Sequence, residues 1–235
     1  MNSKLKEEYD NWHSQHNVTK QKSNNSKALL EFAESILKQL NIEKGEKILD
    51  VACGQSNILK IASEKGVETY GIDVSSVAVD KARLISPRSE ILCGDAQNLP
   101  WEDNFFDYVT CIGSLEHFPR PEKGVKEISR VLKNSGRALI LLPNSYFVGH
   151  IWWVWKTGYL PDEGNQEFSE SFFTNLEGRK MLEDNGLKVL ETTKWNTIWA
   201  SRKVGILTKY AYNFLLVPFI PLNLSYAFIY LCKKS

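Results

Sequence analysis

The segment KILDVACGQSN, residues 47–57, carries the most information about the fold of this 235-residue chain. Its apolar run from Ile48 to Val51 predicts a buried strand of a parallel sheet, and the small residues Ala52-Cys53-Gly54 predict a tight turn after it. A helical pattern follows, with one apolar face formed by Ile58, Leu59, Ile61 and Ala62. A strand, a turn and a helix in this order place a ligand at the carboxyl end of the strand, beside a helix N-terminus.

Four further units follow, in the alternation of strands and helices that is typical of a doubly wound parallel sheet. They are residues 68–74, which contain Asp73; residues 91–96, which end in Gly94-Asp95-Ala96; residues 105–118, in which a strand runs into a loop; and residues 132–142, with a Gly136 turn before the strand. Pro119 and Pro121 predict the start of a helix that reaches Leu132. A second helix is expected from Ser169 to Asn185.

Together the five units resemble the class I S-adenosylmethionine (SAM) methyltransferases, and above all the group of small-molecule enzymes that includes those of the ubiquinone pathway. Residues 50–56 resemble the family motif D-x-G-x-G-x-G, with Ala52 and Ser56 in place of its first and third glycines. Residues 105–118 resemble the family's FDxV…LEH segment. The resemblance implies a Rossmann-like seven-stranded α/β sheet, mostly parallel, with helices on both faces and an aromatic cap. Residues 187–195 fit its sixth strand, and residues 226–233 fit its antiparallel last strand.

The resemblance also implies roles for single residues. Asp73 would hold the ribose hydroxyls of SAM, as carboxylates at this position do in nucleotide-binding folds, and Asp95 would bind the adenine amino group. Asp50 would organise the motif turn, where Gly54 approaches the carboxypropyl arm of SAM. An Asp at a strand end also commonly does no more than bind loop amides. The expected cofactor contacts are Asp50, Ala52, Gly54, Gln55, Asn57, Asp73, Val74, Asp95, Ala96 and Ile112.

His117 is the expected catalytic base. It lies in the loop after the fourth strand, where the acceptor approaches in the resembling family, and a neutral imidazole near pH 7 suits removal of a hydroxyl proton. The alternative is that His117 caps the following turn or packs against the cofactor. Some ubiquinone-pathway relatives bind a divalent metal around this Glu-His pair. Gly113 stands where a further acidic ligand would be, and Glu116 and His117 are too few, so we expect no protein-bound metal.

Composition narrows the classes of partner. The 29 Lys and Arg against 28 Asp and Glu give a net charge of +1, so we expect no nucleic-acid partner. The four cysteines form no C-x-x-C pattern and predict buried, reduced thiols. The polar N-terminus lacks the apolar core of a signal peptide, so a cytoplasmic location is expected. The oligomeric state is not predicted.

The chain divides into an N-terminal lid or helix, residues 1–40, and a methyltransferase domain, residues 41–235. Residues 1–27 either close over the cofactor, as in related enzymes, or form a mobile tail. The aromatic insert at about residues 143–170 predicts a cap that lines an apolar acceptor pocket, the alternative being a small hydrophobic cluster that only closes the domain.

An apolar C-terminal segment lies at about residues 203–222. Residues 210–231 hold no charged residue and match the roughly 20 residues needed to cross a bilayer. Pro218 and Pro221 interrupt a helix there, and the sheet needs its last strand. We therefore expect an apolar helix or cap near residues 203–217, a proline-rich turn and a strand, with peripheral membrane contact by the cap as an alternative.

The predicted function is transfer of a methyl group from SAM to a small-molecule, sugar or lipid-like acceptor, with oxygen as the favoured atom and S-adenosylhomocysteine as the product. The pair Pro143-Asn144 resembles sugar methyltransferases and keeps a glycan acceptor open. One alternative, motivated by Ala52 and Ser56, is a SAM-fold binding or regulatory protein without turnover. Another is an NAD-dependent oxidoreductase, which the missing G-x-G-x-x-G motif argues against.

Overall fold

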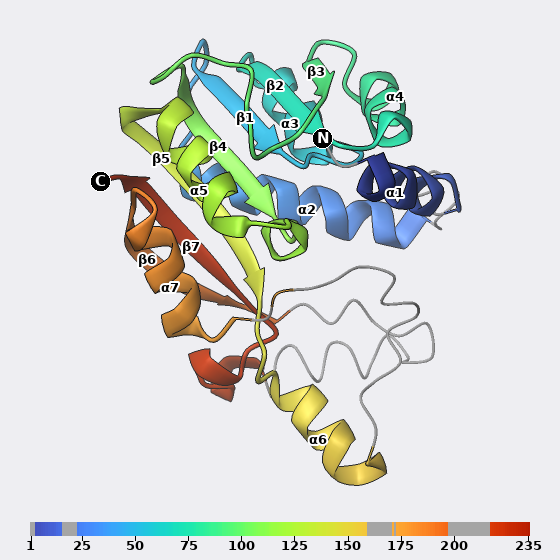
Figure 1. Cartoon of the computed structure of the whole chain (residues 1–235), viewed down its shortest axis with the longest axis vertical. Coiled ribbons are helices and arrows are strands. Elements are labelled where there is room, and N and C mark those ends of the chain that lie inside the picture. Colours follow the sequence, from blue (N-terminus) through green and yellow to red (C-terminus); the bar gives the residue numbers. More distant parts are fainter. Residues whose placement is uncertain (1–2, 16–22, 159–170, 172, 197–216) are drawn as a thin grey trace.

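The apolar run at residues 48–51 forms the central strand of a seven-stranded sheet in the computed structural model of the chain, which describes residues 3–15, 23–158, 171, 173–196 and 217–235 (Figure 1). Ile48, Leu49 and Val51 are fully buried, as expected of a strand with a neighbour on each side and helices over both faces. The strands are β1 (Lys47–Val51), β2 (Glu68–Asp73), β3 (Glu90–Cys93), β4 (Phe106–Ile112), β5 (Leu132–Pro143), β6 (Leu187–Trp195) and β7 (Ala227–Lys234).

The order of the strands across the sheet is β3-β2-β1-β4-β5-β7-β6. Strands β1 to β5 pair in parallel, and β7 runs antiparallel to both of its neighbours, β5 and β6. The predicted fold class is therefore confirmed. The chain runs outward from β1 to β3 and then returns to β4 on the other side of β1. This reversal makes the carboxyl ends of β1 and β4 the topological switch point, where open α/β sheets bind ligands.

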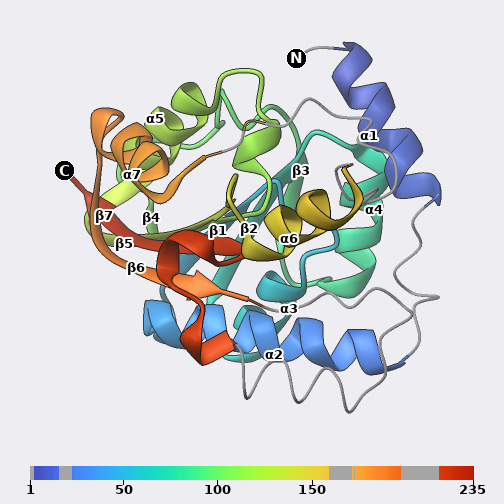
Figure 2. The ribbon, with the colours of Figure 1, turned by 90° about the horizontal axis from the view of Figure 1, so that it is seen from below.

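Helices cover both faces of the sheet (Figure 2). One face packs against α2, α3 and α4, through a core that includes Ile36, Leu59 and Val79. The other face packs against α5 and α7, through a core that includes Ile128 and Leu182. The helices are α1 (Ser3–Gln15), α2 (Ser23–Leu40), α3 (Asn57–Glu64), α4 (Ser76–Ile85), α5 (Pro121–Val131), α6 (Val148–Thr157) and α7 (Asn175–Asp184), with short 3-10 helices η2 (Leu115–His117), η4 (Val217–Phe219) and η5 (Leu222–Leu224).

Two local expectations need correction. The helix expected from Ser169 begins only at Asn175, because Thr174 and Glu177 form a capping box that starts it there. The thiols were expected to be buried, and Cys53, Cys111 and Cys232 are, but Cys93 is exposed at the end of β3, the edge strand of the sheet.

The C-terminal segment is described from residue 217 onward. There it forms the turns η4 and η5 and the strand β7, which agrees with the expected proline-rich turn and last strand. The apolar helix or cap expected near residues 203–217 lies, except for its last residue, outside the described part of the chain. None of the helices in the described ranges is long and apolar enough to cross a bilayer.

Candidate functional site

The turn between β1 and α3 has a backbone conformation that few side chains tolerate. Ala52, Gly54 and Ser56 have positive φ angles of 54°, 51° and 64°. Residues with a Cβ atom rarely adopt this region. The backbone of the turn therefore explains why the motif D-x-G-x-G-x-G has glycine where this chain has Ala52 and Ser56. A Cβ atom built on Gly54 would meet only His13 Cε1, at 4.0 Å. Within the described residues, His13 of α1 thus lies over Gly54 at van der Waals distance of a side chain placed there.

Asp73 connects this turn to the end of β2. Its Oδ2 accepts a hydrogen bond from the Gly54 amide at 2.8 Å, and its Oδ1 accepts one from the Ser75 amide at 2.9 Å. Burial raises the pKa of Asp73, while these two amide bonds favour the ionised form. Each carboxylate oxygen has a second lone pair. Asp73 can therefore hold the turn and still accept hydrogen bonds from a ligand.

Asp50 has a different environment from the one an Asp at a strand end commonly has. Its Oδ1 accepts a hydrogen bond of 2.6 Å from Thr110 Oγ1 on β4. Within the described part of the chain its partner is thus a hydroxyl of the neighbouring strand and not an amide of the turn. Burial raises the pKa of Asp50 to about 7, although the Thr110 hydrogen bond opposes this. Asp50 is therefore a buried group that ties the end of β1 to β4, with a pKa close to neutral pH.

Asp95 and Ala96 lie in the loop that follows β3. Asp95 Oδ1 accepts a hydrogen bond from the Gln97 amide at 2.9 Å, which closes a local turn. Further along the loop, the Leu99 amide donates to Glu127 Oε2 of α5 at 2.7 Å. Both Asp95 and Ala96 remain partly exposed. The loop is thus anchored to the body of the protein at one end, and Asp95 keeps an accessible surface.

The remaining predicted contacts lie along the same edge of the sheet. Val51 of β1 is in register with Ile72 of β2 and with Cys111 of β4, and Asp73 of β2 is in register with Cys93 of β3. The carboxyl ends of these strands therefore lie side by side. The structure brings together at this edge, all of them partly exposed, Ala52, Gly54, Gln55, Asn57, Val74, Asp95, Ala96 and Ile112.

His117 is the last residue of η2, the short helix after β4. Its backbone amide donates to the Ser114 carbonyl at 3.0 Å, and its ring lies edge-on to the Tyr9 ring of α1, with centroids 6.5 Å apart. Burial lowers the pKa of His117 below 6.5. The imidazole is thus neutral near pH 7, as a proton acceptor at this edge must be.

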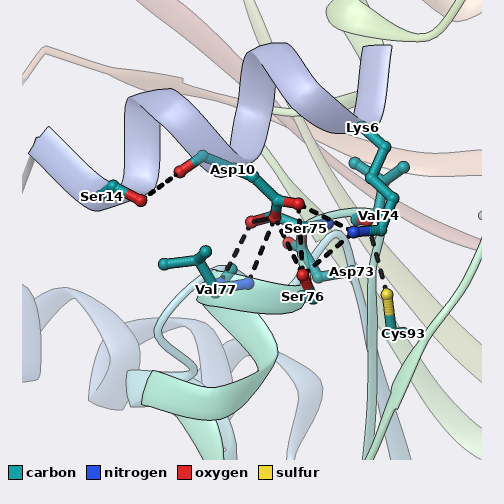
Figure 3. A network of polar contacts seen from close by, with 10 residues as sticks. Lys6, Asp10, Ser14, Asp73, Val74, Ser75, Ser76, Val77 and Cys93 are labelled. Atoms are coloured by element: carbon teal, nitrogen blue, oxygen red, sulfur yellow. Dashed lines mark hydrogen bonds and ion pairs between the residues drawn. The ribbon is translucent and has the colours of Figure 1, made fainter. Parts of the chain in front are cut away.

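Helix α1 packs beside this edge and is attached by Asp10 (Figure 3). Asp10 Oδ1 accepts hydrogen bonds from Ser75 Oγ at 2.6 Å and from the Val77 amide at 3.2 Å, at the start of α4. Lys6 Nζ lies 2.8 Å from Asp10 Oδ2. Burial opposes ionisation, but these hydrogen bonds outweigh it and lower the pKa of Asp10 to about 2. This contact was not predicted, and its one signal in the sequence is the i, i+4 spacing of Lys6 and Asp10.

Three residues of α1 face the candidate site from one helix. Tyr9 contacts His117, Asp10 binds the start of α4, and His13 is the nearest side chain to Gly54. The carbonyl of His13 also accepts a hydrogen bond from Lys81 of α4. Residues 3–15 thus form a helix beside the candidate site, and closure of this segment over a cofactor stays a prediction.

Two further expectations concern metal ligands and the aromatic cap. In the described ranges no three His, Cys, Asp or Glu side chains are grouped as ligands for a metal ion. The described part of the cap forms α6, whose residues from Ile151 to Thr157 are all exposed. A pocket lined by this cap stays a prediction. Residues 159–170, which complete the expected cap, lie outside the described part.

Comparison with known proteins agrees with this geometry. Residues 49–140 match the model of a methyltransferase domain family. The chain is 38% identical over 136 residues to a demethylmenaquinone methyltransferase of Staphylococcus carnosus, over 54% of this chain and 54% of that protein. It is 26% identical over 157 residues to a ubiquinone biosynthesis O-methyltransferase of Coxiella burnetii, over 64% of this chain and 67% of that protein. The alignment thus spans only about half the length of the first relative.

Solved structures share the fold at low sequence identity. One is a chain in the complex between the Haloferax volcanii Trm112 methyltransferase activator and a methyltransferase, with a TM-score of 0.69 and 17% identity, over 98% of this chain and 97% of that chain. Another is the magnesium protoporphyrin IX methyltransferase of Synechocystis PCC 6803, with a TM-score of 0.63 and 16% identity, over 88% of this chain and 83% of that chain. That structure was solved with S-adenosylhomocysteine bound.

Proposed function

Since residues 49–140 match the model of a methyltransferase domain, we propose that the chain is a class I SAM-dependent methyltransferase that transfers a methyl group from SAM to an apolar small-molecule acceptor, at oxygen. The observation that carries this proposal is the link between Asp73 and the Gly54 amide, because it joins the two parts of the expected cofactor site. The partly exposed Gly54 and Asp95 fit a polar ligand that approaches the backbone at this edge.

Each residue of the edge receives a role from its position. Asp73 accepts hydrogen bonds from the ribose hydroxyls, while it continues to hold the Gly54 amide. Asp95 and Ala96 bind the adenine base. The backbone from Ala52 to Asn57, next to the N-terminus of α3, holds the amino-acid part of the cofactor, since helix N-termini favour carboxylates.

The chemistry requires little of the protein beyond alignment. Bound SAM supplies a methyl group on a sulfonium, which is already a good leaving group. The chain aligns donor and acceptor and excludes water, for which α1 is well placed. A ring nitrogen of His117 takes the proton of the acceptor hydroxyl. Its lowered pKa keeps that nitrogen unprotonated at neutral pH.

The proposed acceptor class is a quinone-like ring compound with an apolar substituent. Two of the relatives carry the names demethylmenaquinone methyltransferase and ubiquinone biosynthesis O-methyltransferase. The sugar alternative rested on Asn144, and its side chain is engaged in the fold. Asn144 Nδ2 donates to the Asn223 and Ser225 carbonyls, and its Oδ1 accepts from the Tyr146 amide. Asn144 therefore gives no support to a glycan acceptor.

A second candidate is a SAM-binding protein without turnover, and the positive φ angles of Ala52 and Ser56 favour it. Residues with a Cβ atom are strained at positive φ, so this turn has less conformational freedom than a turn made of glycines. This candidate shares the cofactor site and differs only in the absence of methyl transfer.

The test combines binding with turnover. Calorimetric titration with SAM and transfer of labelled methyl groups to quinols of increasing chain length are expected to succeed with the wild-type chain. Asp73→Asn should weaken SAM binding at least about tenfold, because the charged acceptor of the ribose hydroxyls is lost. Asp80→Asn is the matched control, since Asp80 lies on the exposed side of α4. Asp95→Ala probes the adenine end without removing a buried group.

Two results would decide against the proposal in different ways. Saturable SAM binding with no transfer to any acceptor would establish the binding protein. No binding, with thermal unfolding still cooperative, would remove the cofactor assignment altogether.

A further inference from the structure

Helix α6 exposes apolar side chains that a soluble surface seldom gathers. Ile151, Trp152 and Trp155 are 45%, 50% and 81% exposed, and no residue of the helix is buried. Together with Val148 they have the i, i+3, i+4, i+7 spacing of a single helix face. Three of the ten residues of α6 are tryptophan, which is typical of elements that lie at the boundary between lipid and water.

The face of α6 with Ile151, Trp152 and Trp155 lies opposite the contacts that hold the helix, and Trp153 and Val154 outside this face are also 42% and 38% exposed. His150, on the opposite side of the helix, packs edge-on against Phe147 and against Tyr226, with ring centroids 5.1 and 6.4 Å apart. Tyr226 directly precedes β7, so these contacts fix α6 to the sheet through its other side. Figure 1 shows α6 projecting from the end of the molecule at which β5 terminates.

The one Lys, Arg, Asp or Glu residue of α6 is a lysine. Lys156 lies at the end of α6, with its Nζ 5.0 Å from the centroid of the Trp152 ring. A cation that lies along an aromatic ring can reach anionic headgroups while its stem stays on the apolar face.

A second exposed apolar group lies at the same end of the molecule. Phe219, in η4, is 82% exposed. The backbone around it is held by Lys194, whose Nζ donates to the carbonyls of Pro218 and Ile220 at 2.9 Å each. The turn with Phe219 and the helix α6 both project below the sheet in Figure 1. A planar partner would therefore contact both.

We propose that the apolar face of α6, with Phe219, seats this protein on an anionic lipid bilayer. A membrane fits these observations because the tryptophans are exposed, the charged residues placed at α6 and at the Phe219 turn, Lys156 and Lys194, are basic, and no groove is needed. The helix follows β5, whose carboxyl end belongs to the edge that holds the predicted site. Docking would thus bring that edge to the surface where an apolar acceptor dissolves. This last step rests on the proposed function, whereas docking itself does not.

The test is sedimentation of the full chain with phosphatidylcholine vesicles, with and without phosphatidylglycerol. The wild-type chain should bind the anionic vesicles, and added salt should weaken binding. Trp152→Ala/Trp155→Ala should reduce the bound fraction at fixed lipid so that the partition constant falls at least about tenfold. Trp155→Ala alone and Lys156→Glu should each give a smaller loss. Leu84→Ala is the matched control, because Leu84 is 84% exposed on α4, away from α6, and should bind as the wild type does.

These measurements use no cofactor, so their outcome is independent of methyl transfer. Circular dichroism and the unfolding temperature check that the variants fold, which is expected since α6 buries none of its residues. Equal vesicle binding by the double variant would overturn the proposal. So would no vesicle binding by the wild type, the result expected if another part of the chain or a protein partner covers α6.

Discussion

Replacing Ala52 and Ser56 together by glycine should stabilise the protein. Both residues have positive φ, and this conformation costs about 1–2 kcal/mol for a residue with a Cβ atom. Glycine also raises the conformational entropy of the unfolded chain, which reduces the gain in stability by about 0.4–1 kcal/mol at each position. Ser56 is also only 3% exposed, and its hydroxyl has no hydrogen-bond partner in the described structure. The net gain in the free energy of unfolding is then about 1–2 kcal/mol, which for a chain of this length raises Tm by about 2–8 °C.

Differential scanning fluorimetry and urea unfolding measure this change. Glu34→Gly is the control, because Glu34 is exposed in the middle of α2 and glycine there should lower stability by about 0.5–1 kcal/mol. An unchanged or lower Tm for the Ala52→Gly/Ser56→Gly variant, with the control behaving as expected, would refute the left-handed geometry of the turn. An increase confined to one position would show which of the two residues carries the strain.

Three further predictions follow from the ionisable groups. Burial raises the pKa of Asp50 to about 7, so the folded chain holds this proton more tightly than the unfolded chain between about pH 4 and 7. The free energy of unfolding should fall as pH rises through that window, by at most about 4 kcal/mol, and urea unfolding of Asp50→Asn should lack this slope. Asp10→Asn should speed hydrogen exchange in α1 and leave exchange in β1 unchanged. In the wild type, exchange in α1 should also become faster as pH falls from about 4 toward 2, because the pKa of Asp10 is lowered and its carboxylate becomes protonated there. The methyl-transfer rate should fall at acid pH with an inflection below 6.5, because burial lowers the pKa of His117, and an inflection above 6.5 would exclude this base.

The sheet could be predicted well because its strands are short, buried and apolar. The strands at residues 48–51 and 187–195 appear in the structure with almost the predicted ends. The start of α7, the helix before β6, was predicted less well: it was expected at Ser169 and lies at Asn175. Polar residues before Asn175 do not distinguish a helical turn from a loop, and the contact between Thr174 and Glu177 decides where the helix starts.

The ends of the parallel strands also made the position of the candidate site predictable, since Asp73 is the last residue of β2 and Gly54 lies in the turn after β1. The partners of the charged groups were not predictable. Asp50 meets Thr110 across 60 residues of sequence, and Asp10 meets Ser75 across 65. Hydrophobic periodicity also indicates which residues of α6 are apolar but not what they contact, so the acceptor pocket stays a prediction.

Calorimetric titration of the wild-type chain with SAM and S-adenosylhomocysteine, and with NAD as the control ligand, tests the central claim most directly. The account predicts saturable binding of both adenosyl ligands at one site per chain and no binding of NAD, since the turn after β1 and the carboxylate of Asp73 are arranged for the former. Absence of binding by a chain that unfolds cooperatively, or equal binding of NAD, would contradict it.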